Sequence, residues 1–169
     1  MGKKKIESAI LVEVINGFIR SLLSSLETMV FTKAHRVDIY LKKAGSPMRG
    51  DVSSVISLFG DLSGTCAISF PRGLAVKLIA KMMMDDSLDD VNDDVKDGIG
   101  ELANLVAGGA KSNLHALLGT KTTISLPSVV TGLNHVVEHK DGIPCIGCVF
   151  EAEGERFCME VAVYPDGKG

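Results

Sequence analysis

The sequence predicts an α+β domain in which two long helices pack on an antiparallel β-sheet. Two observations lead to this fold class. A long amphipathic helix pattern stands near the start of each half of the chain, and short strand-like segments separated by hairpin turns follow each helix. The repeated order also suggests pseudo-duplicated halves. With 169 residues, 46% of them hydrophobic, we expect one domain over 1–169 with an ordered core at about 6–164.

The first half contains two helix patterns and three strand patterns. Apolar residues recur at steps of three and four over 6–30, which predicts a largely buried helix. Alternation predicts a strand at 36–42, and a glycine-bounded turn joins predicted strands at 52–59 and 64–70. A second, shorter helix is expected at 72–84, directly after a proline.

The second half begins with an acidic stretch at 85–94. Carboxylates are favoured at a helix N-terminus, so we expect this stretch to lead into a helix at about 92–118, roughly 40 Å long. Strand patterns then dominate to the end of the chain. The predicted strands are 121–126, 129–139, 143–151 and 155–164.

Composition excludes several classes of function. The net charge of −3 and the pI of about 5.8 give no basic face for nucleic acid, and we interpret Lys3–Lys5 as a solubilising terminal run. No uninterrupted apolar run reaches the roughly 18 residues of a membrane span, and no signal peptide pattern is found. We therefore expect a cytoplasmic protein without membrane partners, whose four cysteines stay reduced.

The predicted helix at 92–118 has two chemically different faces. One face is apolar and should pack on the sheet; its residues are Val95, Ile99, Leu102, Val106, Ala110 and Leu117. The opposite side carries what we call the polar stripe: Asp97, Glu101, Asn104, Gly108, Lys111 and His115. Most such stripes are only solvated surface. Here the helix also tolerates four glycines, each costing about 1 kcal/mol relative to alanine, which favours close approach by the sheet or by a partner.

One segment imitates a calcium-binding loop. Asp90, Asn92 and Asp94 stand at alternate positions, and Glu101 occupies the twelfth place. However, Val95 stands where the sharp turn of such a loop needs glycine. We therefore do not predict calcium binding.

Two further spacings could suggest metal or redox chemistry. Cys145 and Cys148 are three residues apart, and on a strand this odd separation directs the thiols to opposite faces. We interpret them as core cysteines. His135 and His139 would be about 13 Å apart on one strand, too far to share a metal ion. The sequence therefore predicts no metal site.

One spacing resembles a known family signature. Asp97, Glu101 and Asn104, followed later by Pro127, resemble the signature of the CheC/CheX/FliY chemotaxis phosphatases. The residues around the motif are similar to those of CheX-like members, and the resemblance extends over about 6–164. It implies a CheC/CheX-like fold, with Asp97 and Pro127 supporting the motif.

The resemblance also implies a function. CheX-like members are homodimers that hydrolyse the aspartyl phosphate of the response regulator CheY, and Mg²⁺ is held by CheY. No cofactor of the phosphatase's own is expected. Family members like CheC carry a second site on the first helix, but here Glu27 is followed by Val30 where asparagine would stand. Valine cannot orient water, so we expect one active site, at Glu101 and Asn104.

Side-chain chemistry suggests how the two catalytic residues divide the work. A carboxamide can both accept from and donate to water and carries no charge that repels phosphate, so Asn104 is expected to orient the attacking water. The resemblance implies a lysine near the phosphorylated aspartate of the receiver, and Glu101 is expected to pair with it. Gly108 and Lys111 are weaker candidates for partner contact. The alternative function is a non-catalytic receiver-binding or flagellar-switch module.

Overall fold

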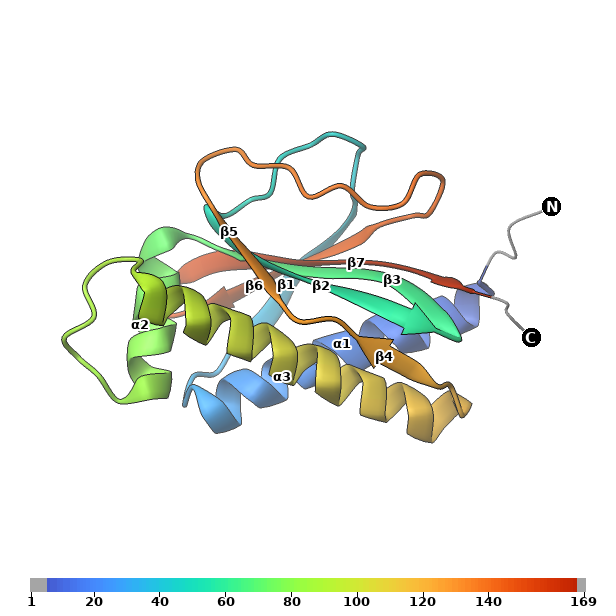
Figure 1. Ribbon diagram of the computed structural model, residues 1–169, viewed down its shortest axis with the longest axis horizontal. Coiled ribbons are helices and arrows are strands. Elements are labelled where there is room, and N and C mark those ends of the chain that lie inside the picture. The colour runs from blue at the N-terminus through green and yellow to red at the C-terminus, as the bar shows by residue number, and fades with distance from the viewer. Residues whose placement is uncertain (1–5, 167–169) are drawn as a thin grey trace.

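The computed structural model describes residues 6–166; Lys3–Lys5 lie outside the described residues. An antiparallel sheet forms the middle layer, with the two long helices against one face and long loops over the other (Figure 1). This arrangement confirms the α+β class and the packing of two long helices on an antiparallel sheet.

The helices agree closely with the sequence prediction. They are α1 (Ser8–Met29), α2 (Arg72–Met83) and α3 (Asp93–Leu118). The strands are β1 (His35–Leu41), β2 (Val52–Gly60), β3 (Leu62–Phe70), β4 (Thr122–Ile124), β5 (Ser128–Thr131), β6 (Ile146–Ala152) and β7 (Glu155–Pro165).

The sheet exchanges strands between the two halves of the chain. Within residues 6–166 it has seven strands, in the order β1-β6-β7-β3-β2-β4, with β5 also paired to β2. The hairpins β2–β3 and β6–β7 meet at the centre through β3 and β7. The strand after α1 pairs with the second hairpin, and the strands after α3 pair with the first. This symmetric exchange fits the expected pseudo-duplicated halves.

The strand predicted at 129–139 is wrong beyond residue 131. β5 runs antiparallel to β2, and its last residue, Thr131, pairs with Val52, where β2 begins. The chain beyond Thr131 therefore has no strand to pair with, and a left-handed backbone at Asn134 (φ 56°) helps turn it away. The segment 132–145 is instead a long loop. The strand predicted at 143–151 likewise begins only at Ile146, where its partner β1 ends.

The main core lies between the helices and the sheet. Phe18 and Leu22 of α1 and Leu102 of α3 are fully buried there. A smaller cluster, containing Met48 and Val137, lies under the loops on the other face of the sheet. Both faces of the sheet are thus covered, but only one of them by helices.

Helices α1 and α3 approach each other closely at one point. The hydroxyl of Ser21 donates a 2.6 Å hydrogen bond to the main-chain carbonyl of Val106. A Cβ atom added to Gly109 would collide with the Ser21 hydroxyl, so the approach requires glycine at this position. This contact fixes how α3 is rotated relative to α1.

Helix α1 is also apolar enough to cross a membrane by length and composition, and it is the one such helix among the described residues. The sequence expectation that no such stretch exists was too strict, because this criterion tolerates the isolated charges of the helix. In the structure the apolar side of α1 has a place in the core, where Phe18, Leu22 and Leu26 are fully buried. A core helix meets the same criterion of length and composition.

The two adjacent glycines of α3 give a matched test of the helix contact. We expect Gly109→Ala to lower the free energy of unfolding by about 1–3 kcal/mol, because the new methyl group overpacks against Ser21. Gly108→Ala should be neutral or stabilise by up to about 1 kcal/mol, since a Cβ there meets open space and alanine favours helix. Urea unfolding of the two variants measures the difference. Equal stabilities would contradict this account.

Candidate active site on helix α3

The N-terminus of helix α3 is fixed by its capping residue, Asn92. The side chain of Asn92 accepts a 3.0 Å hydrogen bond from the main-chain N–H of Val95, and Asp93 and Asp94 occupy the first turn. Asp90 pairs with Arg72 instead, at 2.8 Å. Because the helix begins at Asp93, the segment cannot form the calcium-binding loop that its spacing imitates.

The buried and exposed faces of α3 follow the predicted periodicity for most of its length. The residues predicted to be buried are at most 1% exposed as far as Ala110, and Leu114 continues the buried face. Leu117, which we predicted to be buried, is 57% exposed, so that prediction is wrong. Leu114 is the last buried residue of the helix, since Leu118 in the last turn is also exposed, at 38%.

Glu101 and Asn104 project from the outward side of α3. Glu101 is exposed and Asn104 is partly exposed, and three residues of helix separate them by about 4.5 Å along the axis. Among the described residues, no hydrogen bond or ion pair engages either side chain. An acid and an amide are therefore held side by side on a rigid element, available to an external group.

Pro127 supports this part of the helix by packing. It lies between β4 and β5, as predicted, and a Cβ atom on Gly100 would be 3.3 Å from the Pro127 ring. The proline thus packs against α3 directly beside Glu101. Gly98 is similarly crowded by Ile79 of α2, whereas a Cβ on Gly108 would meet nothing within 4 Å.

The rest of the polar stripe lies on the same exposed side. Asp97 and His115 are exposed and Lys111 is partly exposed. The corresponding place on α1 is different, because Glu27 is exposed but Val30 is fully buried at the helix C-cap. The structure therefore places an exposed acid–amide pair on α3 and no counterpart on α1.

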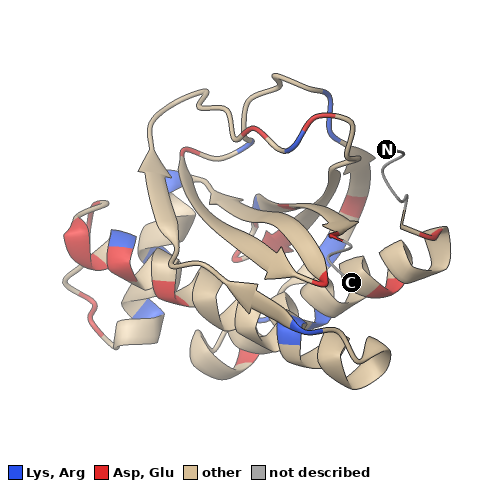
Figure 2. Ribbon diagram, turned by 45° about the vertical axis from the view of Figure 1, so that its right-hand side comes forward, with Lys and Arg blue, Asp and Glu red and all other residues tan. Residues whose placement is uncertain are grey.

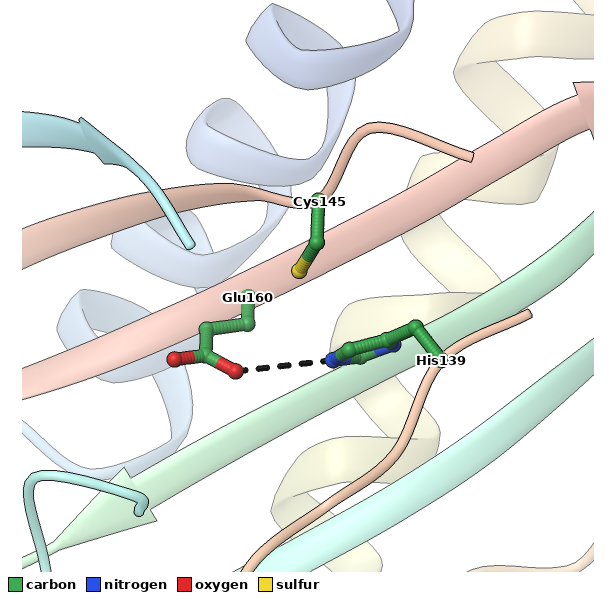
Figure 3. Close-up of side chains that lie close together, drawn as sticks. All are labelled: His139, Cys145 and Glu160. Atoms are coloured by element: carbon green, nitrogen blue, oxygen red, sulfur yellow. Dashed lines mark hydrogen bonds and ion pairs between the residues drawn. The ribbon is translucent and has the colours of Figure 1, made fainter. Parts of the chain in front are cut away.

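The sequence analysis missed a second group of chemically active side chains. His139, Cys145 and Glu160 come together between the sheet and the 132–145 loop (Figure 3), with ligand atoms all within 4.8 Å of one another. We had placed His139 on a strand, where it could not have met Cys145. Cys148 packs in the main core, so the two cysteines do face opposite sides of the sheet.

Lys42 gives this group the character of a buried ion pair. Its ammonium lies 2.6 Å from a Glu160 oxygen, and both side chains are at most 4% exposed. Tyr40 donates a 2.8 Å hydrogen bond to the other oxygen of Glu160. The Nε2 atom of His139 lies 3.4 Å from the Glu160 oxygen that Lys42 contacts, and its Nδ1 atom hydrogen-bonds the Thr65 hydroxyl. A metal ion would have to displace the Lys42 ammonium, which already neutralises the carboxylate.

The pKa values within this group follow from burial and hydrogen bonding. Burial alone would raise the pKa of Glu160, but hydrogen bonds from His139, Lys42 and Tyr40 outweigh it and hold the pKa below its ordinary value. Burial, with a smaller contribution from Glu160, raises the pKa of Cys145 to about 12. Cys145 is thus a neutral thiol at physiological pH.

Comparisons with known proteins assign this fold to a class of proteins. The antiparallel sheet with two long helices is the fold of the chemotaxis phosphatase class. A family model described as "Chemotaxis phosphatase CheX" matches residues 52–151. The chain therefore belongs to the CheX family. No curated protein matched the sequence significantly.

Solved structures agree with this assignment. The chemotaxis protein CheX from Vibrio vulnificus is 32% identical, with a TM-score of 0.81 over 89% of this chain and 99% of that one. A CheC-like superfamily protein from a Shewanella species is also 32% identical, with a TM-score of 0.81 over 90% and 97%. The CheX-CheY-BeF3-Mg²⁺ complex from Borrelia burgdorferi shares the fold at 22% identity, with a TM-score of 0.73 over 89% and 97%.

The buried ion pair makes a testable contribution to stability. We expect Glu160→Gln to lower the free energy of unfolding at pH 7 by about 3–5 kcal/mol, because it leaves the Lys42 ammonium buried without its counter-charge. The matched control is Glu155→Gln, which removes an exposed pair with Lys77 and should cost less than about 1 kcal/mol. Urea unfolding measures both.

The pH dependence of the same variant has a defined sign. Because the folded-state pKa of Glu160 lies below its ordinary value of 4.5, the carboxylate stabilises the fold above that pH. This contribution is lost as the pH falls through the lower folded-state value. The stability difference between the parent and Glu160→Gln should therefore narrow in acid, and a difference that widens in acid would contradict the assignment.

Proposed function

We propose that the chain is a phosphatase that hydrolyses the aspartyl phosphate of a CheY-like response regulator. The single observation that carries this proposal is the exposed pair of Glu101 and Asn104, engaged by no hydrogen bond among the described residues. Membership of the CheX family supports the reaction class. The Borrelia complex of CheX with CheY supports the kind of partner.

Asn104 would orient the attacking water. An aspartyl phosphate is an activated acyl phosphate, so its hydrolysis needs mainly a water in line with the departing carboxylate. The carboxamide oxygen of Asn104 can accept a hydrogen bond from that water, and its NH₂ group can donate to a phosphoryl oxygen. Because the water is held in the attacking position before the reaction, the activation free energy of hydrolysis falls by several kcal/mol.

Glu101 would dock the helix rather than activate water. Its carboxylate would be repelled by the phosphoryl oxygens if it stood beside them. The family resemblance implies a lysine next to the phosphorylated aspartate of the receiver, and a carboxylate one turn from Asn104 is placed to pair with it. That pair would lose its solvent when the helix enters the receiver site, so the contact would govern binding.

Other residues of the site would support this docking. Gly108 leaves open space on the helix surface, through which a partner backbone could approach. Lys111 would contact the partner. The negative charge of Asp97 would interact favourably with the helix dipole near the N-terminus of α3. Pro127 would hold the segment beside Glu101 in place. We propose that Mg²⁺ is supplied by the phosphorylated partner.

We further propose that the chain acts as a cytoplasmic homodimer. β1 is an edge strand, and Ile39 and Leu41 on one of its faces are 51% and 65% exposed. Val37, at a bulge in the same strand, is 38% exposed. An exposed apolar edge strand is well suited to pairing with a second copy. The four cysteines are free thiols, which fits a reducing compartment.

Substitution of the amide tests the catalytic role. We expect Asn104→Ala to slow phosphate release from a Mg²⁺-loaded phosphorylated receiver by about 100-fold or more, because the water loses its orienting group. Asn113→Ala, on the same helix but half a turn round, is the matched control and should retain full activity. Release of phosphate is measured with a purified receiver. Full activity of Asn104→Ala would refute the assignment.

Substitution of the acid tests the docking role. We expect Glu101→Ala to weaken binding of the receiver by about 2–5 kcal/mol, because a desolvated ion pair is lost. Glu27→Ala removes the corresponding exposed acid of α1 and should leave binding unchanged. Titration calorimetry with a receiver carrying BeF3 measures both. Tight receiver binding by the parent chain without faster phosphate release would instead identify a non-catalytic binding module.

A further inference from the structure

We propose that a pocket at the C-terminal end of α3 binds a small aromatic phosphate monoester. The pocket lies between the last turns of α3, the end of β2 and the start of β4, and has a volume of about 430 Å³. This is within the range of small-molecule sites, about 300–1,000 Å³. Binding by the chain alone would establish it, so the inference does not depend on the phosphatase function.

The charges around the pocket favour an anion. Lys111 from α3 and Lys121 from the loop before β4 both line it, and no carboxylate among the described residues lies within ion-pair distance of either ammonium. Asp61 also lies near, because its carboxylate accepts a 2.7 Å hydrogen bond from the main-chain N–H of Lys121. It keeps its single negative charge, which the two lysines together exceed. Figure 2 shows that the acidic residues of α3 all lie in its first half, whereas its second half carries a lysine and no acidic residue. The two lysines outweigh the partial negative charge of the helix C-terminus.

Two hydroxyl groups in the pocket wall lack partners. The side-chain oxygens of Thr120 and Thr122 are buried and make no hydrogen bond, and Thr122 is only 4% exposed. A buried hydroxyl without a partner is unfavourable, since it has lost its water. Both oxygens are covered by protein atoms, so a phosphoryl oxygen would accept their hydrogen bonds only after the side chains turn toward the pocket that both residues line. His115 helps to hold this wall, because its Nδ1 donates a 3.0 Å hydrogen bond to the carbonyl of Thr120.

The apolar part of the pocket indicates what the phosphoryl group is attached to. Phe59 lines the pocket at the end of β2 and is 54% exposed, which is unusual for a ring of this size. A bare phosphate would leave most of the volume and this ring unused. A flat aromatic group attached to the phosphate would stack on Phe59 while the phosphoryl oxygens meet the lysines.

The pocket also adjoins the polar stripe. Lys111 belongs to both, and it follows Asn104 by two turns of helix, about 10 Å along the axis. An occupant would therefore lie beside any partner that covers Asn104.

Titration of the chain with phenyl phosphate, followed by ¹H–¹⁵N NMR at constant ionic strength, tests the proposal. We expect saturable shifts at Thr120, Lys121 and Thr122, with a Kd of about 1 mM or tighter. Lys111→Ala combined with Lys121→Ala should weaken binding about tenfold or more. The matched control, Lys33→Ala combined with Lys96→Ala, removes two lysines elsewhere and should leave the affinity unchanged.

Two further probes separate the ring from the phosphate. Thr122→Val removes an unpartnered hydroxyl, so the fold should persist while affinity falls severalfold. Inorganic phosphate should bind more weakly than phenyl phosphate, and phenol more weakly still. Equal binding of phenol, equal binding of inorganic phosphate, unchanged affinity in the double lysine variant, or no saturable shift up to about 10 mM would each overturn the proposal.

Discussion

The contact of α1 with α3 at Ser21 and Gly109 determines how the rest of the molecule presents its chemistry. The apolar side of α3 determines which side of the helix faces the core. The hydrogen bond from Ser21 to Val106 and the absence of a side chain at Gly109 then allow α1 to pack closely against it. In this arrangement the apolar face meets the sheet and Glu101 and Asn104 point outward. A rigid scaffold of this kind is what the proposed catalysis by positioning would require.

The two faces of the sheet are stabilised by different physics. On one face, aliphatic and aromatic side chains of the helices supply ordinary hydrophobic burial. On the other face, the loops hold only a small apolar cluster, and the buried pair of Lys42 and Glu160 lies beside it. His139 ties the 132–145 loop to this pair. The loop side is thus stabilised by a few hydrogen bonds and ion pairs, whereas the helix side is stabilised by the burial of apolar surface.

The position of the candidate site residues on α3 was predictable from the sequence, because it depends on local rules. Asn92 and Gly119 delimit α3, and its 3.6-residue period places Glu101 and Asn104 on one side. The 132–145 loop was not predictable in this way. Whether Leu133–His139 forms a strand depends on the length of β2, which lies elsewhere in the chain. His139, Cys145 and Glu160 come together only because of the path of that loop, so no spacing in the sequence could have predicted their contact. The pocket beside Lys111 similarly needs three elements to be in place.

The exchange of strands between halves has a consequence for how the chain acquires its structure. β1 is separated from its partner β6 by about a hundred residues, and β3 from β7 by a similar distance. Neither half can complete a sheet from its own strands, so an N-terminal fragment would leave β1 without a neighbour. Assembly must therefore wait for nearly the entire polypeptide, and the domain should fold slowly and all at once rather than half by half.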